Sequence, residues 1–387
     1  MASKKPVERG YYEFFAGGGM ARAGLGPAWR CLLANDVDPK KASAYANNWG
    51  DENLEVCDVA ALAASDLPPG VDLVWASFPC QDLSLAGSGA GLFGSRSGTF
   101  WPFWNLIQAL EAEKRSPNLI VLENVCGALT SHDGQDFRTL IGALRTEGYY
   151  YGALVVDAVH FVPQSRPRLF IIASKDGMPL PGALAGPSPD KTWTTSSLLR
   201  AHESLDPNHK ANWIWWQLPK PDVRKGVFAD VLEDEPTGVR WHTKSETNRL
   251  LDLMSPVNRD KVSLAMESGR RVVGTIYKRT RKNISGARFQ RAEVRFDDIA
   301  GCLRTPTGGS SRQLIMVVEG QRVRSRLLSP REAGRLMGLP EGYDLPCNYN
   351  EAYHLAGDGL VVPVVRHLAQ HILEPLLDIK ANGTLAA

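Results

Sequence analysis

Cysteine is scarce in this sequence, and its cysteines are not arranged to bind a metal. The six cysteines are scattered over 387 residues, with no CxxC pair and no histidine at metal-ligand spacing. Thiols distributed in this way are typical of a reducing cytosolic compartment. We therefore expect a cytoplasmic protein with reduced thiols and no metal centre.

Long apolar runs are missing as well. No stretch of 18 uncharged apolar residues occurs, and the N-terminal lysines are not followed by the apolar segment of a secretory signal, so we expect neither a membrane-spanning helix nor a signal peptide. Coiled-coil heptads are also absent, which makes a monomer the default expectation. Hydrophobic residues at 43% and charged residues at 22% exclude disorder as the dominant state.

The positive charge is concentrated in one segment. Residues 259–295 hold eleven basic and three acidic residues, a net charge of +8, so the rest of the chain carries −6 within an overall +2. No acidic residue interrupts the run formed by Lys278, Arg279, Arg281 and Lys282. A salt-bridged surface is one explanation, but an uninterrupted basic run favours contact with a polyanion such as nucleic acid.

The first 175 residues alternate between strands and helices. Helix-length stretches such as Lys40–Trp49 and Phe103–Lys114 lie between several apolar segments of strand length. The expected strands are Tyr11–Phe15, Arg30–Ala34, Val71–Ala76, Asn118–Leu122, Leu154–Val159 and Arg168–Ala173. The alternation predicts an α/β fold with a doubly wound, mostly parallel sheet, whose ligands bind beyond the carboxyl ends of the strands.

The pattern changes beyond this region. Residues 176–192 are rich in proline and glycine, as in a linker, and no strand–helix alternation is evident from there to about residue 325. The tryptophans of 213–216 could stack on bases, but we expect them in the core of a small domain. We predict a catalytic domain from 1–175 and 350–387, with a returning helix at Val361–Leu377, and a small domain at 176–349.

Two turns after the first two strands suggest a cofactor site. The glycines of 17–19 form a turn in which the backbone can approach a ligand closely. About twenty residues later the second strand ends at Asp36, where a carboxylate typically binds a ribose hydroxyl. Together they suggest an adenosine-containing cofactor, and a purely structural tight turn is the alternative for either one.

Cys80 and Glu123 follow two further strands of the same sheet. A cysteine just beyond Val71–Ala76 lies in the ligand crevice, where its thiolate can act as a nucleophile. The usual alternative, a buried apolar cysteine, fits poorly with Pro79 before it and with the glycines of 87–98, which suggest a loop that closes over substrate. Glu123 ends the next strand at the same edge and could donate a proton to a ring nitrogen.

Arg166 and Arg168 begin another strand, two residues apart. Alternation along a strand would place both side chains on one face. There they could bind either a phosphate or a substrate carbonyl.

Taken in order, these motifs resemble the DNA (cytosine-5)-methyltransferase family in its bacterial and phage form. The resemblance spans roughly residues 11 to 370, and nine motifs in the family's order are not plausibly a coincidence. The matching segments are FAGGG at 15–19, DVD at 36–38, Asp58, PCQ at 79–81, RSGT at 96–99, ENV at 123–125, QSRPR at 164–168, RLLSPRE at 326–332 with LMGLP at 336–340, and GDGLVVPV at 357–364.

The resemblance implies a Rossmann-like class I S-adenosylmethionine-dependent methyltransferase with a small domain that recognises double-stranded DNA. In that reaction Cys80 attacks C6 of a cytosine flipped out of the duplex, and C5 then takes the methyl group. Glu123 would stabilise charge at N3, helped by Arg166 near O2. Loss of the C5 proton would then release Cys80.

The resemblance also assigns residues to each ligand. Catalytic roles belong to Cys80, Glu123, Arg166 and Arg168. Asp36 would hold the ribose, Val37 would pack on adenine and Asp58 would accept from the adenine amine. The cofactor set is completed by Phe15, Ala16, Gly17, Gly19, Phe78 and Asp358. DNA contacts are expected from Pro79, Gln81, Ser84, Asn124, Gln164, Lys278, Arg279, Arg281, Lys282 and Arg304.

Two positions depart from the family pattern near the cofactor. Met20 stands where relatives commonly have a second glycine, and Asp358 stands where they usually have asparagine. Both departures concern the affinity for S-adenosylmethionine rather than the class of reaction.

Three other functions are open. A protein of this type could methylate cytosine in tRNA, although the long basic segment favours duplex DNA. A DNA-binding regulator with a dead active site is disfavoured by the intact motifs at Cys80 and Glu123. A nicotinamide-dependent oxidoreductase explains neither of those residues. The DNA sequence that is recognised, and whether a cognate restriction endonuclease exists, are also open.

Overall fold

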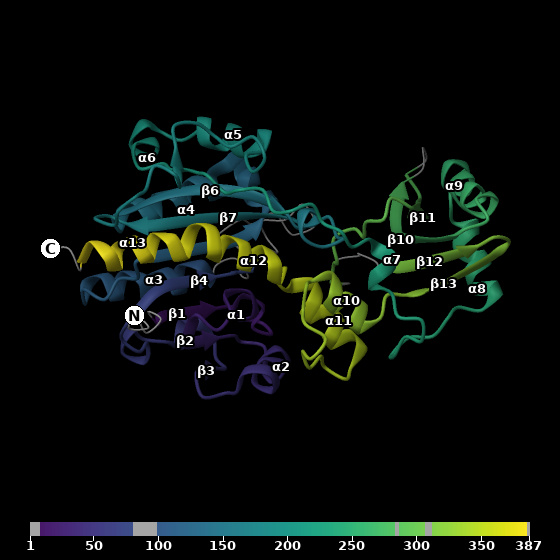
Figure 1. Ribbon diagram of the computed structural model, residues 1–387, viewed down its shortest axis with the longest axis horizontal. Helices are drawn as coiled ribbons and strands as arrows, with labels where there is room; N and C mark the ends of the chain where they lie inside the picture. Colours follow the sequence, from purple (N-terminus) through teal and green to yellow (C-terminus); the bar gives the residue numbers. More distant parts are fainter. Residues whose placement is uncertain (1–7, 80–98, 283–285, 306–311, 385–387) are drawn as a thin grey trace, which may run out of the picture. The chain divides into compact units, whose positions relative to one another are not determined.

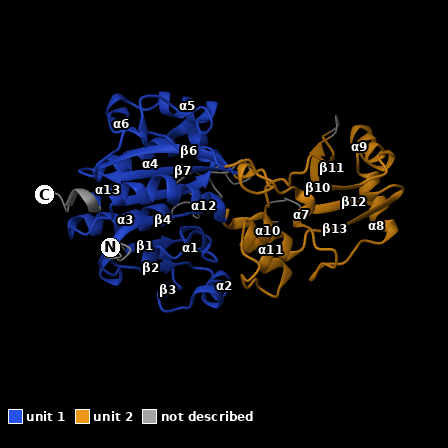
Figure 2. Ribbon diagram, in the orientation of Figure 1, with its two compact units in different colours: residues 1–157, 167–221, 362–387 blue, residues 158–166, 222–361 orange. Residues whose placement is uncertain are grey.

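The chain forms two compact units. The computed structural model describes residues 8–79, 99–282, 286–305 and 312–384 (Figure 1). Unit 1 comprises residues 1–157, 167–221 and 362–387, and unit 2 comprises residues 158–166 and 222–361 (Figure 2). The sequence predicted that the chain passes from one domain to the other after residues 175 and 349. This predicted division differs most from the two units of the structure over 176–221, which belong to unit 1.

A seven-stranded sheet forms the centre of unit 1, in the order β3-β2-β1-β4-β5-β7-β6. Its strands are β1 (Arg9–Phe14), β2 (Trp29–Asn35), β3 (Leu54–Glu55), β4 (Val71–Ala76), β5 (Leu119–Val125), β6 (Tyr149–Asp157) and β7 (Pro167–Lys175). All neighbours from β3 to β5 pair in parallel, and β7 runs antiparallel to both β5 and β6. The predicted mostly parallel α/β sheet is therefore confirmed.

Helices connect the strands and return the C-terminal segment to this unit. They are α1 (Met20–Leu25), α2 (Pro39–Trp49), α3 (Phe100–Ala112), α4 (Gln135–Thr146), α12 (Val362–Leu368) and α13 (Glu374–Thr384). The helix expected at Val361–Leu377 is present, but a π-helical turn at Ala369–Leu373 separates its two α-helical parts. Helix α12 packs against α1, where Gly24 leaves room for Val365.

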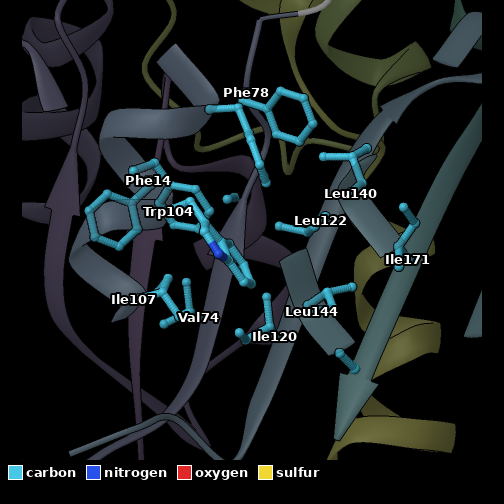
Figure 3. Close-up of a cluster of buried hydrophobic side chains, with 14 of the residues drawn as sticks. Phe14, Val74, Phe78, Trp104, Ile107, Ile120, Leu122, Leu140, Leu144 and Ile171 are labelled. Carbon is cyan, nitrogen blue, oxygen red and sulfur yellow. The ribbon is translucent and has the colours of Figure 1, made fainter. Parts of the chain in front are cut away.

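The core of unit 1 lies between the sheet and helices α3 and α4 (Figure 3). Phe14, Val74 and Ile120 come from three adjacent strands, and Trp104 and Leu140 come from the two helices. A fully buried side chain of this size contributes roughly 1.5–3 kcal/mol. The strand ends that carry the predicted site are thus held by a well-packed layer.

Residues 176–221 fold onto the sheet of unit 1. They contain β8 (Ala185–Gly186), α5 (Ser196–Glu203), α6 (Pro207–Ala211) and β9 (Trp215–Trp216). The indole of Trp216 is buried and donates to the Ile172 carbonyl at 3.1 Å, and Ile214 donates its backbone N–H to Tyr151. The expectation that these tryptophans form the core of a small domain is therefore wrong, because they cover the edge of the large sheet.

A four-stranded antiparallel sheet organises unit 2, in the order β11-β10-β12-β13. Its strands are β10 (Arg271–Lys282), β11 (Arg288–Arg295), β12 (Leu314–Glu319) and β13 (Arg322–Leu327). The helices are α7 (Phe228–Val231), α8 (Lys244–Asp252), α9 (Pro256–Glu267), α10 (Pro330–Leu336) and α11 (Tyr349–Asp358). Leu250 and Val262, from α8 and α9, share a buried cluster with Ile276 and Met316.

Candidate active site and DNA-binding surface

The ends of β4 and β5 bring two of the predicted motifs together. The strands are parallel with Ala76 opposite Leu122, so Phe78 and Pro79 emerge beside Glu123 and Asn124. The Asn124 amide donates to the Phe78 carbonyl at 3.3 Å. Cys80, Gln81 and Ser84 come directly after this point and lie outside the described residues. The ring of Phe78, predicted to contact the cofactor, is itself buried in the core (Figure 3).

Glu123 forms an ion pair with Arg168, the second residue of β7. The Nε atom of Arg168 lies 3.4 Å from Oε1 of Glu123, and both side chains are largely buried. The antiparallel pairing of β5 with β7 produces this contact, because it sets Arg168 opposite Val125. The pair places a carboxyl group and a guanidinium at the edge where the Pro79 segment emerges.

Arg166 has a different environment within unit 2. Its buried guanidinium donates to the carbonyls of Gly357 and Gly359, both at 2.8 Å, and to that of Leu303 at 3.1 Å. The prediction that Arg166 and Arg168 share one strand face is wrong, because β7 begins at Pro167 and Arg166 precedes it. Arg166 therefore holds backbone of unit 2, whereas Arg168 contacts Glu123.

Gln164 is also used within unit 2. Its fully buried amide donates to the Leu336 carbonyl at 2.8 Å and accepts from the Leu303 N–H at 3.1 Å. Residues 158–166 thus join unit 2 through the side chains of Gln164, which was expected to contact DNA, and Arg166, which was expected to be catalytic. The sequence alone does not reveal this role, because the hydrogen-bond partners of Gln164 lie more than 130 residues further along the chain.

The turn after β1 has the geometry of a ligand cradle. Phe15, Gly17 and Gly19 all have positive φ, at 59°, 57° and 75°, a region that costs glycine little. A Cβ built on Gly17 meets nothing within 4 Å, so the backbone there borders open space. Ala16 is buried below the turn, and its N–H donates to the Asn35 carbonyl at 2.9 Å. The turn is thereby fixed to the end of β2.

Asp36 connects this turn with the loop that follows β2. Its carboxylate accepts from the N–H of Gly17 and from that of Asp38, both at 2.8 Å. Val37, between them, is 64% exposed although it is apolar. Asp58 is exposed and accepts from the Ala60 N–H at 2.9 Å, which starts a short 3₁₀ turn. Together these residues form a surface with one exposed apolar side chain, Val37, and two carboxylates, Asp36 and Asp58.

Glu13 is a buried residue of this site to which the sequence assigned no role. It is 2% exposed at the end of β1, and the backbone N–H groups of Ala21 and Arg22 in α1 lie near its carboxyl group and favour the ionised form. Burial raises its pKa from an ordinary 4.5 to about 8, and the Arg22 cation only partly opposes this rise. The sequence feature that could have drawn attention to Glu13 is its position as the one charged residue within the aromatic run of 11–15.

The basic segment of unit 2 forms a hairpin. Strand β10 pairs with β12 only over Arg271–Ile276, and with β11 over 275–282. Beyond Ile276 the chain is therefore a two-stranded antiparallel ribbon, which consists of 277–282 and 288–293. The predicted DNA contacts Lys278, Arg279, Arg281 and Lys282 all lie on it.

Tyr277 stands at the base of this ribbon. Its hydroxyl donates to the Cys302 carbonyl at 3.0 Å, next to the Leu303 carbonyl that Arg166 binds. Burial raises the pKa of Tyr277 well above its usual range, and the nearby cation of Arg304 acts against that rise. The exposed Arg304, another predicted DNA contact, therefore lies near Tyr277.

Two other properties concern the described residues alone. Within the described part of the chain, no helix is both long and apolar enough to span a membrane. Over the same residues, no three or more histidine, cysteine, aspartate or glutamate side chains gather as metal ligands. Asp358 ends α11 in unit 2, and Met20 starts α1 in unit 1, so the two departures from the family pattern are on different units.

The fold defines a class of protein: an α/β protein with a Rossmann-like sheet and a glycine-rich turn after its first strand. A family profile described as C-5 cytosine-specific DNA methylase matches residues 11–374. The chain belongs to this family, and its class of activity is DNA (cytosine-5)-methyltransferase.

Relatives resemble the chain along most of its length. Type II methyltransferase M.HaeII of Haemophilus aegyptius is 26% identical, over 94% of this chain and 92% of its own. Type II methyltransferase M.HpaII of Haemophilus parainfluenzae is 24% identical, over 95% and 89%. The crystal structure of S. pombe Dnmt2 methyltransferase aligns with a TM-score of 0.57 at 18% identity, over 95% and 99%, and it shows the shared fold.

Proposed function

We propose that the protein transfers a methyl group from S-adenosylmethionine to C5 of cytosine in a specific double-stranded DNA sequence, through a covalent adduct on Cys80. The observation that carries this proposal is the buried Glu123–Arg168 pair beside the Phe78–Pro79 segment that leads into Cys80. Cytosine activation requires a carboxyl group and a guanidinium, which Glu123 and Arg168 supply at this edge, together with a thiol, which we assign to Cys80.

The turn after β1 fits S-adenosylmethionine. The open space at Gly17 admits a ligand against the backbone, and the exposed Val37 offers an apolar surface for adenine. Asp36 is oriented by two backbone N–H groups and keeps acceptor capacity for a ribose hydroxyl. Asp58 is exposed to accept from the adenine amine. When bound, the cofactor supplies an electrophilic methyl group on a sulfonium.

The residues of the site would divide the chemistry as follows. The Cys80 thiolate forms a bond to C6, which makes C5 electron-rich, while Glu123 hydrogen-bonds at N3. C5 then forms a bond to the methyl carbon, while the bond between that carbon and the sulfonium sulfur breaks. A base then takes the C5 proton, and the S–C6 electron pair returns to Cys80. We assign the contact with the cytosine O2 to Arg168 rather than Arg166, because Arg168 is the arginine that touches Glu123.

The small unit would supply DNA binding, since its ribbon concentrates basic side chains. Relatives named Type II methyltransferases support a role in a restriction–modification system with a cognate endonuclease. We further propose a cytoplasmic monomer. The base must leave the stack for attack at C6, so base flipping is part of the proposal.

The test is to incubate the protein with tritiated S-adenosylmethionine and a mixed-sequence duplex that carries 5-fluorocytosine. Fluorine at C5 blocks elimination, so we expect a labelled protein–DNA adduct that survives denaturation and is lost in Cys80→Ala. Cys126→Ala is the matched control, because burial raises the pKa of Cys126 to about 11 and makes it a poor nucleophile. An adduct that persists in Cys80→Ala would exclude Cys80 as the nucleophile.

The same assay distinguishes the RNA alternative. Transfer into unmodified tRNA and into duplex DNA is measured in parallel under identical conditions. We expect label in DNA only. Preferential labelling of tRNA would replace the DNA substrate, and cofactor binding without transfer to either would favour a silent DNA-binding regulator.

A further inference from the structure

The basic ribbon of unit 2 has two faces of different chemistry. Side chains alternate along a strand, and residues directly opposite across an antiparallel pair share a face. The arginine face consists of Arg279, Arg281, Phe289, Arg291 and Glu293. The lysine face consists of Lys278, Thr280, Lys282, Arg288 and Gln290. The basic run of 278–282 is continuous in the sequence, but the alternation of side chains along β10 divides it between the two faces.

The two faces continue different parts of unit 2. The lysine face extends from Ile276, Ala292 and Val294, which are buried with residues of α8 and α9. The arginine face extends from Tyr277, whose hydroxyl bonds the Cys302 backbone. Cys302 and Leu303 also contact the guanidinium of Arg166. The arginine face therefore continues from backbone that Arg166 holds, and Arg166 comes two residues before the catalytic arginine Arg168 in the chain.

The arginines are held in place by neighbours on their own face. Glu293 forms an ion pair with Arg279, with 3.1 Å between Oε2 and Nε, and a second ion pair with Arg281. The guanidinium carbon of Arg291 lies 4.9 Å from the ring centre of Phe289, a cation–π contact. Both Arg279 and Arg281 are nevertheless about half exposed. Their donors are oriented and still accessible to a ligand.

Like charges lie directly opposite each other in this ribbon. Arg279 faces Arg291, and Lys282 faces Arg288. Directly opposed like charges destabilise a strand pair, so the arrangement is a cost to the free protein that a bound polyanion would remove. A two-stranded ribbon also has the width that the major groove of B-DNA admits.

We infer that the arginine face reads base edges in the major groove, with Arg279 and Arg281 as guanine-reading side chains oriented by Glu293, whereas the lysine face acts only through attraction to phosphates. This inference rests on the proposed function. Arginine binds guanine O6 and N7 with two parallel hydrogen bonds, which lysine cannot reproduce. The recognised sequence therefore contains guanine at the positions that the ribbon reads.

The experiment expresses each variant in a host without cytosine methylation and maps 5-methylcytosine by bisulfite sequencing. Arg279→Lys and Arg281→Lys keep the charge and remove the fork, so each should relax one position of the motif by on the order of tenfold to a hundredfold. Lys282→Gln, on the other face, should keep the motif and lower methylation uniformly. Thermal melting checks that each variant is folded.

Salt dependence of duplex binding provides a second readout. The log–log slope should fall by about one in Lys282→Gln and stay unchanged in Arg279→Lys and Arg281→Lys. Glu293→Gln should bind non-cognate duplex more tightly, because a negative charge is lost, and should discriminate less. A simple surface ion pair predicts tighter binding with unchanged discrimination.

The outcomes are separable from failure of the proposed function. An unchanged motif in both lysine variants, or an equally relaxed motif in Lys282→Gln, would overturn the inference. If the wild type made no 5-methylcytosine, the proposed function would fail, and the ribbon would be tested by selecting bound duplexes from a random pool. Loss of an enriched guanine in the arginine variants would still support the ribbon, and selection of no motif by the wild type would overturn it.

Discussion

Glu13 is a buried residue next to the glycine turn after β1, and it makes the stability of the fold depend on pH. Its carboxyl group lies near N–H groups at the start of α1, directly after the turn at Gly17 and Gly19. With a folded pKa of about 8 against an ordinary 4.5, the folded state keeps its proton to higher pH than the unfolded state. This group therefore stabilises the fold fully below pH 4.5, and its contribution is lost as the pH rises through 8.

The substitution Glu13→Gln tests this coupling. Glutamine keeps an acceptor for the two N–H groups and cannot ionise, so the variant should lose less stability between pH 5 and pH 9 than the wild type. The difference should reach a few kcal/mol, since each pKa unit corresponds to about 1.4 kcal/mol. Denaturant melts of both proteins across this pH range measure it. If the stability of the two proteins changed in parallel over this pH range, Glu13 would already be ionised in the folded state, which would contradict its raised pKa.

Arg168 is the residue for which the structure changes the chemistry most. Arg168→Ala should lower the single-turnover methyl-transfer rate on the order of a hundredfold, because a preorganised charge beside Glu123 is lost. Binding of S-adenosylmethionine, measured by calorimetry, should change little. Arg30→Ala, at an exposed ion pair with Glu8, is the control and should leave both quantities unchanged. A loss of cofactor binding without a loss of rate would contradict the assignment.

Sequence reasoning succeeded where contacts are local and failed where they are distant. Val71–Ala76 forms the predicted strand, and the turns after β1 and β2 meet as expected because parallel neighbours end at one edge. The partners of Arg166 could not be inferred, since they lie at Leu303, Gly357 and Gly359. The tryptophans of 213–216 were misplaced for the same reason, because their contacts are with β6 and β7.

At the scale of elements, the pairing of α1 with α12 joins the two ends of unit 1. Gly24 lies on α1 where a Cβ would overlap the Val365 side chain. Alanine is ordinarily the better helix former, so a substitution here sets helix propensity against packing. The close approach of the two helices should decide the outcome.

We therefore expect Gly24→Ala to destabilise the protein by roughly 1–3 kcal/mol, as overpacked cores do. Gly182→Ala is the matched control, because its added Cβ would meet nothing within 4 Å. Chemical denaturation of both variants measures the difference. A neutral or stabilising Gly24→Ala would mean that the two helices separate at little cost.

At the scale of the whole molecule, the two proposed ligands address different units. S-adenosylmethionine should slow amide hydrogen exchange around Gly17 and Asp38, whose N–H groups already bond Asp36, and leave strand β10 unchanged. A cognate duplex should slow exchange in 277–282. Mass spectrometry of the protein with each ligand alone measures both effects. Cofactor protection confined to unit 2 would contradict the division of roles.

Unit 2 is not continuous in the chain, and this governs how its specificity can be exchanged. Residues 158–166 leave the large sheet after β6 and return to it at β7, yet the side chains of Gln164 and Arg166 hydrogen-bond the backbone of unit 2. A chimaera that replaces 222–361 alone would place a foreign loop against the native Gln164 and Arg166. A transplanted recognition unit must therefore bring its own copy of the short segment between β6 and β7.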